Sequence, residues 1–183
     1  MTSRILALFL LLLMSPILII ISIIILIDDG TPIIFKQKRI GKNNNYFKIY
    51  KFRTMLNNTP ELATHLLKQS DRQYTFTGKF LRKYSLDELP QLINIIRGEL
   101  SFIGPRPALY NQNDLIKLRT KKKIHLLNPG VTGWSQTHGR DNLNISEKVK
   151  LDYFYLKNRT FFLNVKIIYL TIVKVIFAKD VSS

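Results

Sequence analysis

The sequence predicts a mixed α+β protein, rich in helix, with an N-terminal membrane helix ahead of one small domain. Three observations predict this class. Residues 5–27 form an uncharged apolar run, residues 32–55 contain two β-prone segments around a Gly/Asn turn, and later segments repeat apolar residues at helical spacing. With 183 residues, the chain is long enough for one domain with a core and too short for two of ordinary size.

The apolar run is predicted to be a retained membrane helix. At about 1.5 Å per residue it could extend roughly 35 Å, which exceeds a hydrocarbon core of about 30 Å. It is too long for the core of a signal peptide, and the following DDGTPIIF offers no small-residue cleavage site. The predicted organisation is therefore a membrane helix at residues 1–29 and a domain at residues 30–183.

Ser15 and Pro16 interrupt this helix near its middle. Pro16 lacks an N–H and crowds the carbonyl of Leu12, so we expect a kink or break, with Ser15 able to satisfy a freed backbone group. An ordinary spanning helix with a tolerated proline and a re-entrant helix both stay open. Arg4 precedes the run and basic residues follow at 36–42, so the two ends do not differ in charge, which favours re-entry.

The domain is predicted to begin with a β-hairpin and to continue mainly as helices. Asn58-Thr59-Pro60 predicts a helix from Pro60 to about Lys68. Further helices are predicted at 85–98, about 109–126, 144–158 and about 161–178, with a capping box at Asn144 and Glu147. The last helix is interpreted as amphipathic, lying on the bilayer or packing on the domain. Residues 128–142 are predicted to be a turn-rich loop.

The charge balance indicates anionic partners. Lys and Arg number 28 against 12 Asp and Glu, a formal charge of +16. Such an excess suits nucleic acid, an anionic membrane surface or phosphate-rich substrates. The absence of cysteine excludes disulfides, thiolate metal sites and cysteine nucleophiles.

The segment SLDELPQLINIIRGELSFIGPRP, residues 85–107, holds the strongest chemical candidates. Ser85 and Glu88 stand at capping-box spacing, and Gly98 is suited to end the helix. Pro90 conflicts with a helix that starts at Ser85, and a start nearer Glu88 removes the conflict. In either register Asp87 and Glu88 lie at a helix N-terminus, which favours ionised carboxylates suited to nucleophilic attack or metal binding.

Arg106 follows this helix between Pro105 and Pro107. The two prolines restrict the backbone, and a pre-set guanidinium suits bidentate phosphate binding. Acids in a first helical turn usually only complement the helix dipole. Two carboxylates combined with a rigid arginine, however, are the parts that Mg²⁺-dependent phosphoryl transfer requires.

Three motifs carry a family resemblance. YKFRTM, LRKYSLDELPQLINIIRGELSFIGPRP and NPGVTGWSQTHGR occur in this order after the Ser-Pro-interrupted helix. Over nearly its whole length the chain resembles the bacterial sugar transferases, the monotopic phosphoglycosyl transferases, in their minimal catalytic form. The resemblance implies a catalytic domain on the cytoplasmic face of the bacterial inner membrane. It would transfer a sugar-1-phosphate from a UDP-sugar to undecaprenyl phosphate through a covalent aspartyl intermediate, initiating surface glycan synthesis.

The resemblance also assigns roles to individual residues. Asp87 would be the nucleophile, and Glu88, with Asp87, would hold Mg²⁺. Phosphate-contacting roles would fall on Arg53, Arg82 and Arg106, with Lys51 as a weaker match, and nucleotide-contacting roles on Gln136 and Arg140. Two departures concern Asn164, where the family usually has an aspartate, and THGR, which replaces the usual NGR.

Alternative interpretations stay open at this level. The charge would equally suit a membrane-anchored binding protein for anionic lipid or nucleic acid, although no stacking aromatics interleave with the basic runs, so nucleic acid is not expected. Asp28-Asp29-Gly30 could serve a metal-dependent glycosyl transferase, but we interpret it as a helix-terminating turn. Trp134 is interpreted as a packing residue, His138 as an exposed loop residue and Asp152 as an ordinary helix-face acid. The expected partners are a UDP-sugar, undecaprenyl phosphate and inner-membrane lipid; the identity of the sugar and a homodimer stay open.

Overall fold

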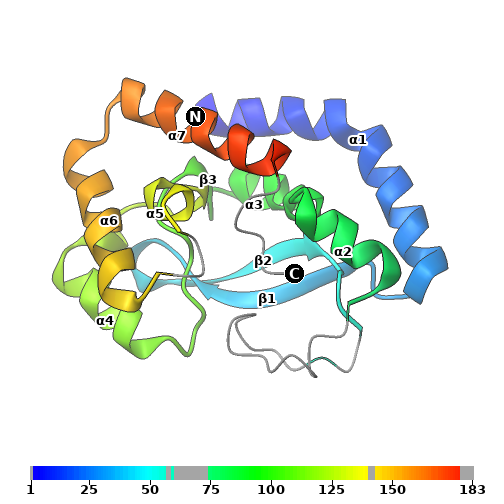
Figure 1. The fold of residues 1–183 in the computed structure, drawn as a ribbon, viewed down its shortest axis with the longest axis horizontal. Helices are drawn as coiled ribbons and strands as arrows, with labels where there is room; N and C mark the ends of the chain where they lie inside the picture. Colours follow the sequence, from blue (N-terminus) through cyan, green and yellow to red (C-terminus); the bar gives the residue numbers. More distant parts are fainter. Residues whose placement is uncertain (1, 57–58, 60–73, 140–142, 178–183) are drawn as a thin grey trace. The chain divides into compact units, whose positions relative to one another are not determined.

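The computed structural model describes residues 2–56, 59, 74–139 and 143–177 (Figure 1). The described residues form two compact units. The first takes its residues from 1–37 and 49–96, and the second from 38–48 and 97–180. The helix predicted from Pro60 to Lys68 and the candidate Arg140 lie outside the described residues.

Helix α1, Thr2–Asp29, is continuous through Pro16 and bends along its length (Figure 1). The Ser15 hydroxyl donates a hydrogen bond of 2.8 Å to the Leu12 carbonyl, the group that Pro16 leaves without its usual amide partner. The compensating role predicted for Ser15 is confirmed, and the helix continues through Pro16 without a complete break. Among the described residues, α1 is the one helix long and apolar enough to cross a membrane.

The predicted hairpin is confirmed. Strands β1, Ile34–Ile40, and β2, Tyr46–Phe52, form a two-stranded sheet and are joined by the 3₁₀ turn η1, Lys42–Asn44. Asn43 and Asn44 turn the chain with φ values of 55° and 60°. Asparagine tolerates this left-handed conformation better than most residues, which explains why a run of asparagines marks the turn.

The first unit is built on the second half of α1. Helix α2, Phe76–Lys83, follows its N-cap Thr75, and η4, Leu86–Glu88, and α3, Gln91–Arg97, come next. A buried cluster joins α1, β2 and α2 and includes flanking side chains of η4; its main members are Ile21, Ile25, Phe52 and Leu81, with Leu86 and Leu89 packed against them. The cluster therefore places η4 against the end of the apolar helix.

The single helix predicted over residues 85–98 is wrong in one respect. It is divided into the 3₁₀ turn η4 and helix α3, because α3 begins only after Pro90 and thus loses no internal hydrogen bond to it. Ser85 has φ 55° and its side chain makes no capping hydrogen bond, so the predicted capping box is absent. Gly98, with φ 80°, follows the last residue of α3 as predicted.

The second unit contains a small parallel sheet and four α-helices among its described residues. Strands β3, Ser101–Ile103, and β4, Gly130–Thr132, pair with Ser101 opposite Gly130 and Ile103 opposite Thr132. The helices are α4, Asn113–Lys121; α5, Trp134–Thr137; α6, Ile145–Asn158; and α7, Phe161–Ile176, with the 3₁₀ turn η5, Ile124–Leu126, after α4. The predicted capping box between Asn144 and Glu147 is confirmed.

Helix α7 is amphipathic, with Ile167, Asn164 and Thr171 turned toward its own unit. Ile167 is fully buried, Asn164 accepts a hydrogen bond from Tyr155, and Thr171 is 2.6 Å from Thr132. The outward positions instead carry exposed apolar side chains: Phe161, Phe162, Val165, Ile168, Tyr169, Ile172 and Ile176. The helix thus packs on its own unit through a mixed face and leaves an apolar face uncovered.

Candidate active site

The structure brings together Asp87, Glu88 and Lys51, all in the first unit. The Lys51 ammonium, carried by β2, lies 2.7 Å from Glu88 Oε1 and 3.9 Å from Asp87 Oδ2. Asp87 is buried, and the side chains of Lys51 and Glu88 are 17% and 10% exposed. Adjacent carboxylates repel each other when water is excluded, and the positive charge of the Lys51 ammonium stabilises the pair.

Local packing fixes the turn that carries these acids. The Glu88 amide donates to the Ser85 carbonyl at 3.1 Å, and Leu86 and Leu89 on either side of the acids pack on the buried cluster. The buried Asn94 of α3 accepts a hydrogen bond of 3.0 Å from the Tyr50 amide, beside Lys51. Asn94 was not singled out from the sequence; its place on the inward face of α3, next to Ile95, is the signal that could have found it.

The two acids fit a magnesium site. Mg²⁺ in phosphoryl-transfer sites is usually held by one or two carboxylates, with substrate phosphates and water completing its ligands. Asp87 and Glu88 supply that donor set, and Lys51 marks the spot as one that stabilises positive charge. Across the part of the chain that the structure describes, no group of three or more His, Asp or Glu side chains could hold a metal ion without such substrate ligands.

The side chain of Arg53 contacts the C-terminal end of α1. It is 4% exposed, and its Nη2 donates to the backbone carbonyls of Asp29 at 2.7 Å and Gly30 at 2.9 Å, while lying 3.0 Å from Asp29 Oδ2. A guanidinium suits the carbonyls at a helix C-terminus, where the helix dipole favours positive charge. A direct phosphate contact by Arg53 would require these hydrogen bonds to open.

Arg82 lies in the last turn of α2, just before the backbone turns at Ser85. Its Nη1 is 3.5 Å from the sulfur of Met55, and its guanidinium stands 5.3 Å from the ring centre of Tyr74. It is partly buried and stands five residues before Asp87. Arg82 thus belongs to the same unit as the two acids and Lys51.

The proline-flanked Arg106 belongs to the second unit, where a buried network holds its backbone. Arg119 of α4 donates to the Arg106 carbonyl at 2.7 Å and binds Asp152 Oδ2 through Nε at 3.0 Å and Nη2 at 2.6 Å. Ser135 donates to the other oxygen of Asp152 at 2.8 Å. The prolines restrict the turn from within, and Arg119 fixes it from outside.

One interpretation of the sequence is corrected by this network. Asp152 is 1% exposed and ion-paired, so it is not an ordinary helix-face acid. Arg119 is buried as well, although it lies in the basic stretch at 117–123. Its i, i+4 relationship to the buried Leu115 is the signal that separates it from the neighbouring lysines.

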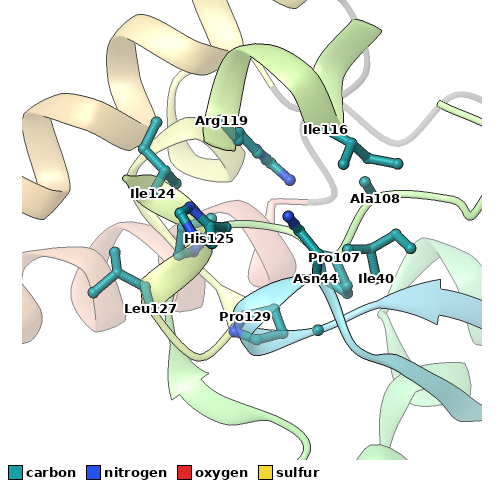
Figure 2. Close-up of a pocket in the computed structure, with 12 residues that line it drawn as sticks. Ile40, Asn44, Pro107, Ala108, Ile116, Arg119, Ile124, His125, Leu127 and Pro129 are labelled. Atoms are coloured by element: carbon teal, nitrogen blue, oxygen red, sulfur yellow. The ribbon is translucent and has the colours of Figure 1, made fainter. Parts of the chain in front are cut away.

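Figure 2 shows a pocket behind the same turn, with Arg119 pointing into it. Pro105 and Pro107 line it together with apolar side chains such as Ile40, Ala108 and Ile116. The guanidinium at its wall is already bound to Asp152 and to the Arg106 carbonyl. The pocket therefore lies against the proline-flanked turn, and Asn44 and His125 add polar side chains to its lining.

A model of the bacterial sugar transferase family matches residues 1–178. The chain belongs to the bacterial sugar transferase family. The resemblance carried by the three motifs is thereby confirmed.

Named relatives agree with this assignment. The chain is 39% identical to EpsL of Bacillus subtilis, named an uncharacterized sugar transferase, over 96% of this chain and 85% of the relative. It is 36% identical to an undecaprenyl-phosphate glucose phosphotransferase of Komagataeibacter xylinus, over 95% of this chain and 35% of the relative. It is also 36% identical to the UDP-glucose:undecaprenyl-phosphate glucose-1-phosphate transferase of Escherichia coli, over 93% of this chain and 38% of the relative. The chain thus spans little more than a third of these last two proteins.

Gln136 of this sugar transferase is buried beside the proline-flanked turn. Its Oε1 accepts a hydrogen bond from Ser135 at 3.0 Å, and its Nε2 lies 3.4 Å from the Gly104 carbonyl. Close packing of the two segments is also seen at Gly133, where a Cβ atom would meet the Gly104 oxygen at 2.1 Å. Gln136 therefore belongs to the same corner of the second unit as Arg106.

Three other residues have structural roles in this sugar transferase. Trp134 packs against His138 and Phe154, with ring centres 3.9 Å and 5.4 Å apart, which confirms its packing role. His138 is exposed, as predicted. Asn164, which departs from the family pattern, accepts a hydrogen bond of 3.0 Å from the hydroxyl of Tyr155.

Proposed function

We propose that this sugar transferase moves a sugar-1-phosphate from a UDP-sugar to undecaprenyl phosphate, with Asp87 as the covalent nucleophile, and so initiates synthesis of a bacterial surface glycan. The observation that carries the proposal is the buried Asp87–Glu88 pair held against Lys51. The substrates in the name of the Escherichia coli relative, UDP-glucose and undecaprenyl phosphate, support the same donor and acceptor classes. Which sugar is used depends on contacts that the fold alone does not define.

In the first step, a carboxylate oxygen of Asp87 forms a bond to the β-phosphorus of the donor. The bond from that phosphorus to the oxygen bridging the two phosphates breaks, and UMP leaves with the bonding electrons. The phosphosugar remains on Asp87 as an acyl phosphate. Lys51 lies 3.9 Å from Asp87 and orients its carboxylate, and a carboxylate nucleophile needs no base to activate it.

In the second step, a phosphate oxygen of undecaprenyl phosphate attacks the same phosphorus. The bond between phosphorus and the Asp87 oxygen breaks, and its electron pair returns to the carboxylate. The product is an undecaprenyl diphosphosugar. The attacking phosphate is already anionic, so this step also needs no strong base.

Cationic groups would balance the charge of the two substrates. Glu88, with Asp87, would hold Mg²⁺, which when bound would offset the negative charge of the diphosphate. Arg82, Arg106 and Lys51 would bind phosphate oxygens, and Arg106 is best suited because its backbone is fixed by two prolines and by Arg119. Gln136 and Arg140 would contribute to the nucleotide site.

The membrane placement is part of the proposal. The bend along α1 and the Ser15–Pro16 pair within it support a re-entrant helix that enters and leaves on the cytoplasmic face of the inner membrane (Figure 1). The uncovered apolar face of α7 suits the interface between headgroups and acyl chains, and the basic stretch at 117–123 suits anionic lipid. This arrangement would hold the acids where a soluble donor meets a lipid-anchored acceptor phosphate.

The alternative of a basic binding module for anionic lipid or nucleic acid is not favoured. The named relatives are transferases. A binding module would also have no use for two adjacent acids held against Lys51, since such a pair lowers the positive charge of the surface.

The proposal is tested by transfer of label from UDP-sugars carrying ³²P in the β-phosphate. The purified protein in lipid nanodiscs should give a labelled protein adduct without acceptor, and labelled lipid with undecaprenyl phosphate. Asp87→Asn should abolish both products while keeping the thermal unfolding temperature of the native protein. Asp114→Asn, at an exposed acid in the first turn of α4, is the matched control. An adduct of normal yield in Asp87→Asn would show that another residue is the nucleophile.

Topology is tested separately by cysteine labelling, because the native chain has no cysteine. Single cysteines at Thr2 and Lys42 should both react from the cytoplasmic side alone. Labelling of position 2 from the periplasm would establish a spanning helix.

A further inference from the structure

The turn that ends α1, Asp28–Gly30, contacts both of the elements that hold the two acids. On one side it meets the segment that directly follows β2. Arg53 of this segment donates from Nη2 to the carbonyls of Asp29 and Gly30 at 2.7 Å and 2.9 Å, and pairs with Asp29 Oδ2 at 3.0 Å. Arg53 stands two residues after Lys51, immediately after the last residue of the strand.

On its other side the turn meets α2. Asp28 Oδ2 accepts hydrogen bonds from the Thr77 amide at 2.9 Å and from the Thr77 hydroxyl at 2.7 Å. Thr75 already caps this helix by accepting from the Gly78 amide at 3.0 Å. Asp28 therefore satisfies a second free amide of the first turn of α2, and it does so from a different element of the fold.

Helix α2 and strand β2 are also joined directly. The Thr75 amide donates to the Thr54 carbonyl at 3.2 Å. At Gly78 an added Cβ would lie 2.1 Å from the same carbonyl oxygen, so the helix lies against the backbone that follows Arg53. The turn, the strand end and the helix start thus form one polar contact region, which we call the junction: Asp28, Asp29, Arg53, Thr75 and Thr77.

Two short routes lead from the junction to the acids. Along β2, Lys51 reaches Glu88 at 2.7 Å. Along α2, Leu81 packs in the same buried cluster as Leu86 and Leu89, which flank Asp87 and Glu88. A shift of the end of α1 would therefore act on the acids from both sides, because neither route contains a flexible linker among its described residues.

We propose that Asp28, with Arg53 and Thr77, is a positioning residue for the second half-reaction. These residues fix the position of Asp87 relative to the apolar helix α1. The inference rests on the proposed function. A lipid-anchored acceptor presents its phosphate at a depth fixed by the membrane, whereas a soluble donor can diffuse to the acids at any depth. The junction should therefore matter for transfer to the acceptor and little for adduct formation with the donor.

The first experiment compares the half-reactions of Asp28→Ala in nanodiscs. Acceptor-independent release of UMP should stay within about twofold of the native rate, whereas transfer to membrane-embedded undecaprenyl phosphate should fall by about tenfold or more, since a displacement of about 1 Å can cost up to a hundredfold. With a short-chain polyprenyl phosphate in detergent micelles the defect should vanish. Asp28→Asn, whose amide oxygen can accept the same hydrogen bonds, should recover most of the transfer rate, and Asp114→Ala should behave as the native protein.

Three results would overturn the proposal: native transfer to the membrane acceptor in Asp28→Ala, an equal loss in both half-reactions, or an equal loss with the short-chain acceptor. The last two would make the junction only a stabilising contact of the fold. Thr77→Val, which removes the hydroxyl and keeps the amide donor, should show a smaller loss in the same direction.

A second measurement does not depend on catalysis. Spin labels on cysteines at Leu12 of α1 and Lys83 of α2, both exposed, report the distance between the two helices in nanodiscs. The native background should give one narrow distribution, and Asp28→Ala a broader one, with Asp28→Asn again close to native. An unchanged distance distribution in Asp28→Ala would show that the junction does not fix α1 relative to α2. If the native protein transfers no label from any UDP-sugar, the proposed function fails, and this distance measurement alone decides whether the junction fixes α1.

Discussion

The ammonium of Lys51 lies 2.7 Å from the Glu88 carboxylate, on a strand that the sequence places well before the acids. The Lys51 ammonium lies where a hard metal ion would also be attracted, because the carboxylates of Asp87 and Glu88 are both negatively charged. Lys51 and Mg²⁺ should therefore compete for the same carboxylate oxygen in the substrate-free protein.

Replacement of Lys51 by Met should tighten Mg²⁺ binding. With the competing ammonium removed, the Mg²⁺ concentration that gives half of the maximal thermal shift should fall by about tenfold, equivalent to ~1.4 kcal/mol. The measurement uses thermal unfolding in nanodiscs across a Mg²⁺ series without substrate. Lys79→Met, at an exposed position of α2, is the matched control, and Glu88→Gln should remove the Mg²⁺ effect. Weaker Mg²⁺ binding in Lys51→Met would mean that the lysine supports the metal site and does not compete with it.

Arg106→Lys should impair catalysis without affecting the fold. The contact that anchors this turn uses the backbone carbonyl of Arg106, which the substitution keeps. Lysine retains the charge and loses the planar fork that binds two phosphate oxygens, so kcat/KM should fall by about tenfold or more. Steady-state kinetics with a labelled UDP-sugar measure this, with thermal unfolding as the check on folding. Native kinetics in Arg106→Lys would mean that this proline-flanked turn has only a structural role.

Asp152→Ala should be strongly destabilising. It leaves the buried guanidinium of Arg119 without its ion-pair partner, a change that costs about 3–5 kcal/mol. The double variant Arg119→Met/Asp152→Leu should recover much of this loss, because it leaves no unpaired buried charge. Urea unfolding in a mild detergent compares the two variants with Asp114→Ala, which should stay within about 0.5 kcal/mol of the native protein. Equal losses in the single and double variants would contradict the interpretation.

The features that could be predicted from the sequence are local ones. The compensating hydrogen bond of Ser15 beside Pro16, the hairpin at the asparagine run and the capping box of Asn144 with Glu147 each depend on a few neighbouring residues. The acids were recognised for the same reason, since a spaced motif carries them. Their partner Lys51 was found only as a weak phosphate candidate, because its contact with Glu88 requires the strand and the turn to meet in space.

The features that were missed depend on distant partners. Nothing beside Arg119 or Asp152 in the sequence indicates that a residue 33 positions away is its ion-pair partner. The contact of the Arg53 guanidinium with the carbonyls of Asp29 and Gly30 likewise could not be predicted, because the strand end and the helix end meet only in space. Pro90 indicated a later helix start, but the 3₁₀ turn that carries the acids was missed.

Gly78→Ala should destabilise the first unit more than Gly30→Ala. A Cβ at residue 78 would meet the Thr54 carbonyl oxygen at 2.1 Å, and neither the helix nor this backbone can move without breaking the junction. The cost should reach about 3 kcal/mol. Gly30 has φ +70° with no atom within 4 Å of the added Cβ, so its substitution costs only the left-handed strain of about 1–2 kcal/mol. Equal unfolding free energies for the two variants would indicate that α2 can move away from Thr54.

The last prediction concerns the stability of the second unit at alkaline pH. Tyr155 is 6% exposed and donates to Asn164 at 3.0 Å. Burial raises the pKa of Tyr155 above 10.0, against a smaller opposing effect of the Arg159 charge. Between the unfolded pKa of about 10 and the raised pKa of the folded protein, the unfolded chain has lost the proton and the folded protein keeps it. The stability that Tyr155 contributes is therefore fully present below pH of about 10. It is lost as the pH rises through the folded pKa, with a slope approaching ~1.4 kcal/mol per pH unit.

The Tyr155→Phe variant isolates this effect. At pH 8 it should be less stable than the native protein by about 1 kcal/mol, the worth of one hydrogen bond. Above pH 10 the native protein should lose stability more steeply, because phenylalanine has no proton to release, and the difference between the two should shrink. Urea unfolding from pH 8 to pH 11 measures both curves, and Tyr169→Phe, at an exposed position of α7, should run parallel to the native curve. Parallel curves for Tyr155→Phe as well would mean that the hydroxyl ionises in the folded protein as readily as in the unfolded chain.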